Sequence, residues 1–386
     1  MKKYFLLFFI ILFFNSVIEA SNVGKKFPSE RKTWTDSETG FEITQWTNNT
    51  AKSWHLYFNI ESFMDNNHAI IFSEREGNKN LFILEFTTGE LTQITDEDSI
   101  QGAVWHLPQY NKLYYMLNDN TLKSIDTKTY DTKAIKKFDV PISSFTVTSD
   151  DKWFVFSSEK IYENNSNKSI GPFFIYKYGF DSKELVQITP GYGFVIGHLQ
   201  ASPTDPDLVS FCWQHLINKD NGTQGDTPQR IWQVNIKESE VKPIALQETG
   251  LHRTHEFWFY DGSKIGYSAR YTWGKNKGKQ FIGFCNPDGS ENIMMSAPVG
   301  PAHSQMYKDN VHWVSDLFDG SVLVLFSIQN GQIEKSERLF KHDSSWKGQP
   351  SHPHPHFSPD GDRILFSTDK TGIPQVYSVK INLNGK

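Results

Sequence analysis

A polar turn followed by an alternating or apolar strand recurs along this chain. The pattern occurs about 50 residues apart, a period typical of propeller blades. Seven units share it: 64–72, 107–115, 148–156, 202–211, 260–267, 318–325 and 358–366. Another strand follows most units, and several end in a fourth, as in 89–95 and 183–189. The sequence therefore predicts an all-β fold, a seven-bladed β-propeller. A pair of β-sandwiches is the alternative.

The last unit stops at Lys386 without a fourth strand. Near the other end of the chain, 40–47 (Gly-Phe-Glu-Ile-Thr-Gln-Trp-Thr) has the form of a fourth strand but no first three strands of its own. We expect this N-terminal strand to complete the last blade and close the ring, because closure removes exposed sheet edges. Residues 21–386 would then form a single propeller domain.

The chain begins with Met1-Lys2-Lys3 and an apolar run over 4–14, and a small residue, Ala20, follows soon after. This is the pattern of a signal peptide over residues 1–20. The apolar run is shorter than the roughly 20 residues of a membrane span. Ser21 stands where a lipoprotein would have cysteine. We therefore expect an exported protein without a membrane anchor, either periplasmic or secreted.

Composition excludes some partners. The net charge is −5 with both signs interspersed, so no basic patch for nucleic acid is expected. Two cysteines are too few for a disulfide framework. The aromatic content of 15% suits both all-β cores and sugar-binding clefts.

Histidine and proline alternate in 349–356, Gln-Pro-Ser-His-Pro-His-Pro-His. Proline excludes a helix here, and alternate side chains of an extended segment point the same way. His352, His354 and His356 can then project together, and Gln349 can add a neutral oxygen. Imidazole suits zinc, copper, iron or nickel, and a carbonyl oxygen tolerates manganese or magnesium. The segment predicts a divalent metal site with neutral ligands, which would attract an acidic substrate. An exposed His/Pro turn is the alternative.

Several of the thirteen histidines stand where blades begin. Loops from different blades meet at the mouth of a propeller channel, so these side chains can converge although they are far apart in sequence. Each one taken singly is more often structural or exposed. Outside the cluster at 352–356 they are His55, His106, His198, His255 and His303.

Three segments together resemble the oligogalacturonate lyase family: 253–262, which contains Thr-His-Glu-Phe-Trp, 342–346, and 349–360, which contains Gln-x-x-His-Pro-His-Pro. Further support comes from 230–232, 197–198 and 36–47. The resemblance implies a seven-bladed propeller that cleaves short pectic oligosaccharides by β-elimination at a divalent metal, typically Mn²⁺.

Residue by residue, the resemblance implies that Gln349, His352 and His354 are metal ligands. His303 offers a fourth ligand, displaced by one position from the family's pattern. His255 matches the base that abstracts the proton, and Arg230 matches the arginine that binds substrate.

The proposed chemistry fits these residue types. The C5 proton of a uronide becomes acidic when a cation and an arginine withdraw charge from its carboxylate. A neutral histidine, with a reference pKa near 6.5, can accept that proton.

Each role has a structural alternative. His255 could be hydrogen-bonded to Glu256 at a strand end, and Arg230 could form an ion pair between blades. His356 replaces a small residue of the family pattern and could be a bystander.

One wall of the pocket departs from the family. The family has His-Glu-Gly-Pro soon after a cysteine, whereas this chain has Phe-Cys-Trp-Gln-His-Leu-Ile over 211–217 and an insertion over 218–228. We expect His198 and His215 to contact substrate on this side, together with Arg230. The change leaves the substrate open between oligogalacturonides and glucuronate or ulvan-type oligosaccharides.

Two other functions remain as alternatives. A glycoside hydrolase would need a pair of carboxylates, which the sequence does not single out. A non-catalytic binding propeller would have no need for the His/Gln cluster.

Overall fold

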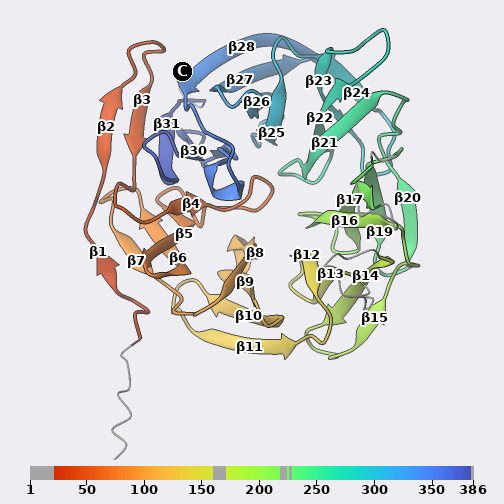
Figure 1. The fold of residues 1–386 in the computed structure, drawn as a ribbon, viewed down its shortest axis with the longest axis horizontal. Helices are drawn as coiled ribbons and strands as arrows, with labels where there is room; N and C mark the ends of the chain where they lie inside the picture. The colour runs from red at the N-terminus through yellow and green to blue at the C-terminus, as the bar shows by residue number, and fades with distance from the viewer. Residues whose placement is uncertain (1–20, 160–170, 218–223, 226–227, 384–386) are drawn as a thin grey trace, which may run out of the picture.

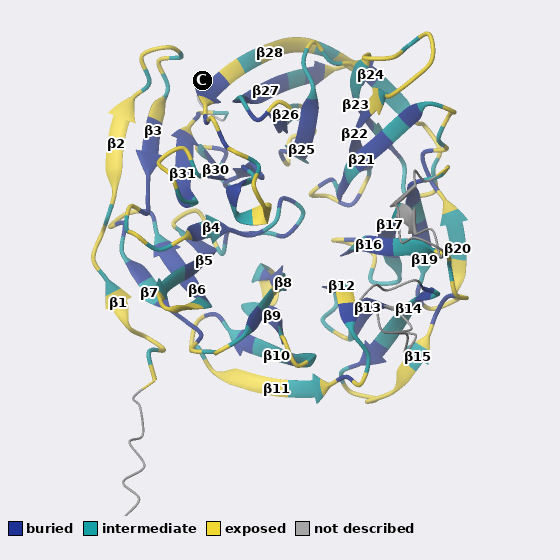
Figure 2. Ribbon diagram, viewed as in Figure 1, coloured by how far each residue is buried: buried dark blue, intermediate teal, exposed yellow. Residues whose placement is uncertain are grey.

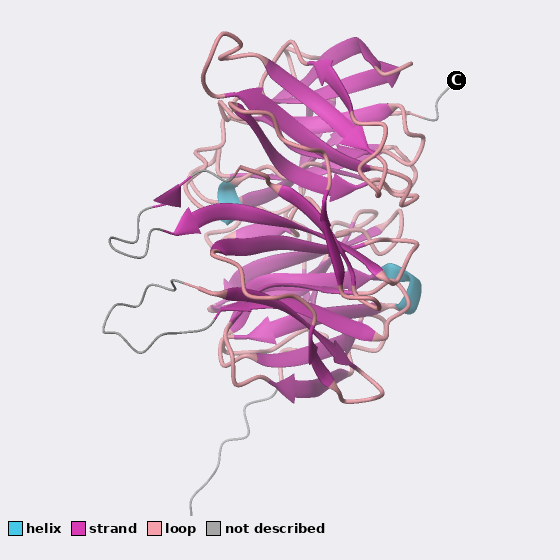
Figure 3. Cartoon of the chain, turned by 90° about the vertical axis from the view of Figure 1, so that its right-hand side faces the viewer, coloured by secondary structure: helices cyan, strands magenta, loops and turns pink. Residues whose placement is uncertain are grey.

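Seven antiparallel sheets form a closed ring in the computed structural model, which describes residues 21–159, 171–217, 224–225 and 228–383 (Figure 1). The predicted seven-bladed β-propeller is confirmed. Seen from the side, the described residues form strands and loops with two short helical turns, η1 (Pro108–Tyr110) and η2 (Gln349–Ser351) (Figure 3). Within the described part of the chain, neither helix is long and apolar enough to span a membrane.

The first strand of each blade lies nearest the centre of the ring (Figure 1). From the centre outward, the first blade has β4 (Ser53–His55), β5 (His68–Glu76), β6 (Asn78–Glu85) and β7 (Leu91–Gln93). The second has β8 (Ile100–Leu107), β9 (Lys112–Leu117), β10 (Thr121–Asp126) and β11 (Thr132–Lys137). The third has β12 (Ile142–Val147), β13 (Trp153–Glu159), β14 (Phe173–Gly179) and β15 (Leu185–Gln187).

The remaining blades follow the same order. The fourth has β16 (Phe194–Ala201), β17 (Leu208–Ile217), β19 (Ile231–Asn235) and β20 (Glu240–Pro243), and β18 (Gln224–Gly225) pairs with β17. The fifth has β21 (Leu251–Trp258), β22 (Ile265–Tyr271), β23 (Gln280–Cys285) and β24 (Ile293–Ser296). The sixth has β25 (Pro301–Met306), β26 (His312–Leu317), β27 (Val322–Gln329) and β28 (Gln332–Lys341). The seventh begins with β29 (His356–Phe357), β30 (Arg363–Thr368) and β31 (Gln375–Lys380).

The N-terminal strand closes the ring as predicted. β3 (Glu42–Gln45) pairs antiparallel with β31, placing Ile43 opposite Val379. The sequence interpretation missed two further strands. β2 (Lys32–Thr35) adds a fifth strand to the last blade outside β3, and β1 (Lys26–Phe27) pairs with β7 of the first blade. The N-terminal segment therefore joins the outer edges of both blades at the closure.

Six of the seven sequence units mark the turn between the first and second strands of a blade. The unit at 318–325 instead marks the turn between β26 and β27. The equivalent first turn of that blade has Asn310, at φ 57°, whereas the 318–325 turn has Gly320 at φ 70°. Both residues adopt the left-handed region that such turns require. The sequence pattern selected the turn that contains Gly320 rather than the turn that contains Asn310.

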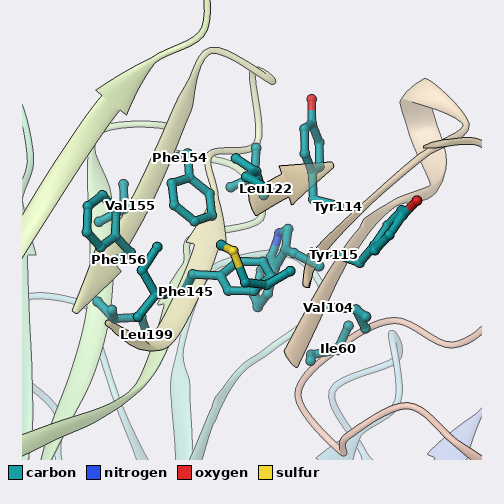
Figure 4. Packing of buried hydrophobic residues seen from close by; sticks show 14 of the residues in the cluster. Ile60, Val104, Tyr114, Tyr115, Leu122, Phe145, Phe154, Val155, Phe156 and Leu199 are labelled. Atoms are coloured by element: carbon teal, nitrogen blue, oxygen red, sulfur yellow. The ribbon is translucent and has the colours of Figure 1, made fainter. Parts of the chain in front are cut away.

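Hydrophobic side chains fill the space between neighbouring blades. The largest cluster runs from the first blade to the fourth, and Figure 4 shows Phe145, Phe154 and Phe156 packed near Tyr115 and Leu122. Buried residues concentrate on the inner strands, whereas the outermost strands such as β2 and β11 are exposed (Figure 2). The rigid ring of inner strands carries the candidate site.

Candidate active site

Irregular backbone in three inner strands orients the side chains of His198, His255 and His303. The pairing of β16, β21 and β25 with the next strand shifts register at Gly197/Gln200, Thr254/Phe257 and Pro301/Ser304. Such bulges turn a side chain away from the regular alternation of a strand. His198 and His255 have φ values of 50° and 53°, which is uncommon for a residue other than glycine and is found at functional sites.

Three of the predicted metal ligands lie together. His303, His352 and His354 each offer a ring nitrogen, and these nitrogens lie within 4.8 Å of one another. The ring of His303 is 4.3 Å from that of His354 and 5.4 Å from that of His352, between centroids. Nε2 of His354 is buried without a hydrogen-bond partner among the described residues. The donor set fits a divalent metal that accepts imidazole.

The neutral state of these three histidines also suits metal binding. Burial and the proximity of other histidines hold the pKa of His303 and that of His354 well below the usual range, and burial lowers the pKa of His352. A metal binds the neutral imidazole, which is the form these pKa shifts favour at neutral pH.

Asp316 on β26 orients the metal-binding group. Its Oδ2 accepts a hydrogen bond from Nδ1 of His303 at 2.9 Å, and its Oδ1 accepts the backbone N–H of His303 at 2.7 Å. The backbone N–H of His354 also donates to Oδ2, at 3.3 Å. Asp316 is fully buried. Because Nδ1 carries the proton that it donates, Nε2 of His303 is the nitrogen left free for a metal.

His55 on β4 holds the backbone of one predicted metal ligand, His354. Its Nε2–H donates to the backbone carbonyl of His354 at 2.6 Å, and Ser367 lies 2.7 Å from its Nδ1. This histidine therefore fixes the chain at a metal ligand and is not itself one of the grouped ligands.

His356 does not join His352 and His354 as the alternating pattern predicted. His354 has φ 46°, which breaks the extended run. His356 lines a cavity of about 770 Å³ together with His106, beyond the site along the inner strands. The prediction that all three histidines share one face was wrong, and the interpretation of His356 as a bystander fits the structure.

Gln349 is exposed on η2, and its role as a ligand stays a prediction. Trp346, which the sequence analysis did not select, stacks on His352 with 4.5 Å between ring centroids and lies 5.3 Å from the His303 ring.

His255 is placed as a base should be. Its ring lies 4.0 Å from that of His303, and its Nδ1 is buried without a hydrogen-bond partner among the described residues. Burial, with the neighbouring His303 and Arg230, holds the pKa of His255 well below its usual range. His255 is therefore neutral at neutral pH and able to accept a proton.

Glu256 links two other predicted residues. Its Oε2 accepts Nε–H of Arg230 at 3.1 Å, and its Oε1 lies 2.7 Å from Nδ1 of His198. Burial by itself raises the pKa of Glu256, but the charges of Arg230 and His198 outweigh it and hold the pKa well below the usual range. Arg230 thus forms the inter-blade ion pair that was its structural alternative. Contact of Arg230 and His198 with substrate stays a prediction.

The loop after β4 brings in residues that the sequence analysis missed. It reaches into the centre of the ring (Figure 1). Its Phe58 is fully buried and lies 5.2 Å from His303 and 5.8 Å from His255, between ring centroids. Its Tyr57 lies 4.6 Å from the His354 ring, and the tyrosine hydroxyl is 3.3 Å from Nε2 of His198. Burial, then the charge of Glu256, raises the pKa of Tyr57, so the hydroxyl keeps its proton.

The altered wall lies in the fourth blade. The backbone of His215 belongs to β17, but its side chain and most of the insertion lie outside the described residues. Trp213 stacks on Phe194 with 4.2 Å between centroids, and lies 4.1 Å from Trp232 and 5.4 Å from Tyr192. Trp213 therefore belongs to a partly exposed aromatic cluster, and its place on the substrate side of the pocket stays a prediction.

The family model of oligogalacturonate lyase matches residues 184–384, just over half of the chain. The chain belongs to the oligogalacturonate lyase family. It is 24% identical to the oligogalacturonide lyase of Pectobacterium atrosepticum and 25% identical to the oligogalacturonate lyase of Dickeya dadantii. Each alignment covers 93% of this chain and 98% of the relative.

Solved structures share the fold. An oligogalacturonate lyase in complex with manganese superposes with a TM-score of 0.81 at 22% identity, over 94% of this chain and 98% of that one. The oligogalacturonate lyase of Vibrio parahaemolyticus gives 0.82 at 23% identity, over 94% of this chain and all of its own length. The enzyme class predicted from the sequence, a lyase, is confirmed by this family membership.

Proposed function

We propose that this protein cleaves short uronic-acid oligosaccharides, oligogalacturonides first among them, by metal-assisted β-elimination that leaves a 4,5-unsaturated uronate. The observation that carries the proposal is the position of the neutral base His255. Its ring centroid lies 4.0 Å from that of His303, and a ring nitrogen of His303 lies within 4.8 Å of ring nitrogens of His352 and His354. A base beside a cation site is what removal of a proton next to a carboxylate requires.

His303, His352 and His354 would hold the metal, with Gln349 as a further oxygen ligand. When bound, a divalent cation withdraws charge from the uronate carboxylate and so acidifies the C5 proton. We propose Mn²⁺, because one similar structure is an oligogalacturonate lyase in complex with manganese and because the ligand set is neutral and mixes nitrogen with oxygen.

The chain's own residues then perform the proton transfer. The free nitrogen of neutral His255 accepts the C5 proton. Glu256 holds Arg230 through Nε, and we propose that the two terminal nitrogens of Arg230 bind the substrate carboxylate. The hydrogen bond to Glu256 orients His198, which we propose lines the substrate side of the pocket. The C4–O4 bond breaks as the C4–C5 double bond forms.

The aromatic cluster around Trp213 favours a second candidate substrate. Aromatic faces stack on sugar rings, and this wall replaces polar family residues, so glucuronate-containing or ulvan-type oligosaccharides are the alternative for the same elimination. Residues 1–20 have the pattern of a signal peptide, so we also propose that the enzyme is exported, in the periplasm or outside the cell.

Mass spectrometry of the products tests the reaction class. An elimination gives two products whose masses add up to the mass of the substrate. A hydrolase gives products whose combined mass exceeds the substrate by one water, and that result would contradict the proposal. A panel of galacturonate and glucuronate oligosaccharides decides between the two substrate classes in the same experiment.

A further inference from the structure

The loop over 56–65 holds Tyr57 in a fixed position at the centre of the ring. The backbone N–H of Ile60 donates to the carbonyl of Tyr57 at 2.8 Å. Ser62 accepts the N–H of Leu56 on its hydroxyl at 3.3 Å and that of Ile70 on its carbonyl at 2.8 Å. The loop is therefore tied to itself and to β5, and a side chain on it is preorganised.

Tyr57 and His255 both lie beside the metal ligands. The Tyr57 ring lies 6.0 Å from that of His303 and 4.6 Å from that of His354. The ring of His255 lies 4.0 Å from His303, and these two described side chains, Tyr57 and His255, have no ring contact with each other. A uronide whose carboxylate faced His303 and His354 would thus have both a base and a phenol close to it.

The hydroxyl of Tyr57 also belongs to a hydrogen-bonded chain. It lies 3.3 Å from Nε2 of His198, whose Nδ1 is 2.7 Å from the carboxylate of Glu256. Through this chain, Glu256 and His198 position the phenol and give it a neighbour that can exchange protons with solvent.

Elimination needs a second proton transfer, to the leaving O4, besides the transfer of the C5 proton to His255. The leaving O4 is bonded to C4, the direct neighbour of C5, so a donor distinct from the base must lie close to the metal ligands beside which the base stands. The Tyr57 hydroxyl, on a ring that lies beside two of the metal ligands, meets this requirement.

On the basis of the proposed function, we propose that Tyr57 is the catalytic acid that protonates the leaving O4. The C5–H bond breaks and its proton goes to His255, while the electron pair forms the C4–C5 double bond. The C4–O4 bond breaks and O4 takes the hydroxyl proton of Tyr57. The phenolate regains a proton from solvent by way of His198, and His255 releases its proton to solvent, so the enzyme ends unchanged.

The test compares Tyr57→Phe with the wild-type enzyme, both loaded with Mn²⁺, on two substrates. One is digalacturonate, whose leaving sugar oxygen needs a proton. The other is a galacturonate with 4-nitrophenol at O4, whose leaving phenolate needs none. The variant should lose roughly 10²- to 10⁴-fold in kcat/KM on digalacturonate and less than about tenfold on the nitrophenyl compound.

The variant keeps the aromatic ring that packs on Phe58 and His354, so bound Mn²⁺, measured by atomic absorption, should equal that of wild type. The matched control is Tyr176→Phe in the third blade, which should behave as wild type on both substrates. Equal losses on both substrates, or digalacturonate turnover within about threefold of wild type, would overturn the role of Tyr57. Failure of the proposed function gives a different result, because the wild-type enzyme itself would then form no 4,5-unsaturated product from either substrate.

Discussion

His303 and Asp316 face each other across β25 and β26 with 2.9 Å between Nδ1 and Oδ2. The carboxylate fixes both the orientation and the tautomer of the imidazole, so that Nε2 is presented toward His352 and His354. A carboxylate behind a histidine ligand is a recurrent device of metal sites.

Replacing this carboxylate should weaken metal binding. Asp316→Asn keeps the shape but lets the amide misorient His303, and we expect Mn²⁺ affinity to fall roughly 10- to 100-fold, measured by titration calorimetry. Asp309→Asn is the control, since Asp309 bonds His312 at 2.6 Å on the surface of the same blade. Equal affinities for both variants would show that Asp316 does not act on a metal ligand.

Replacing the base should separate chemistry from metal binding. His255→Ala should reduce turnover roughly 10²- to 10⁴-fold and leave the bound Mn²⁺ unchanged. The His352→Ala, His354→Ala double variant should lose both. Metal analysis beside kinetics distinguishes them, and a His255→Ala protein without metal would mean that His255 is a ligand.

The buried neutral histidines should make the fold sensitive to acid. Burial lowers the pKa of His106 to about 4 and that of His342 to about 4, from 6.5. The unfolded chain therefore binds more protons than the folded one between these values, and stability present above pH 6.5 is lost as the pH falls toward 4.

Each such histidine contributes a slope of up to about 1.4 kcal/mol per pH unit. Urea unfolding at several pH values should show this loss, and His106→Gln should reduce the slope by up to that amount. His68→Gln, at a surface position, should leave the slope unchanged. A stability that is flat from pH 7 to pH 5 would contradict the prediction.

Ring closure should depend on Ile43. This fully buried side chain packs with the last two blades, so Ile43→Ala should lower the free energy of unfolding by about 2–5 kcal/mol. Lys32→Ala on exposed β2 should change it by less than about 0.5 kcal/mol. Denaturant titration measures both, and similar values for the two variants would mean that closure by β3 contributes little.

The fold was accessible from sequence because its signals are local. Each blade repeats a turn and alternating strands. The strand around Ile43 has the form of a fourth strand without the first three, which indicates that it completes the last blade and closes the ring. The pair His352 and His354 was accessible for the same reason, since proline fixes the extended backbone between them.

The rest of the site depends on contacts that no local pattern encodes. Asp316 reaches His303 only through a strand pairing that contains a bulge. Tyr57 reaches His198 only because a loop from the first blade folds into the channel. A positive φ at His354 sends His356 away from its neighbours, and alternation alone could not foresee that.

The most direct test of the proposed function is ultraviolet absorbance during incubation of the purified protein with digalacturonate and trigalacturonate. Each run is made with Mn²⁺ and again with a chelator, beside glucuronate oligosaccharides. We predict new absorbance from a 4,5-double bond with the galacturonides, lost on chelation. Cleavage without that absorbance, or absorbance unaffected by the chelator, would contradict metal-assisted elimination.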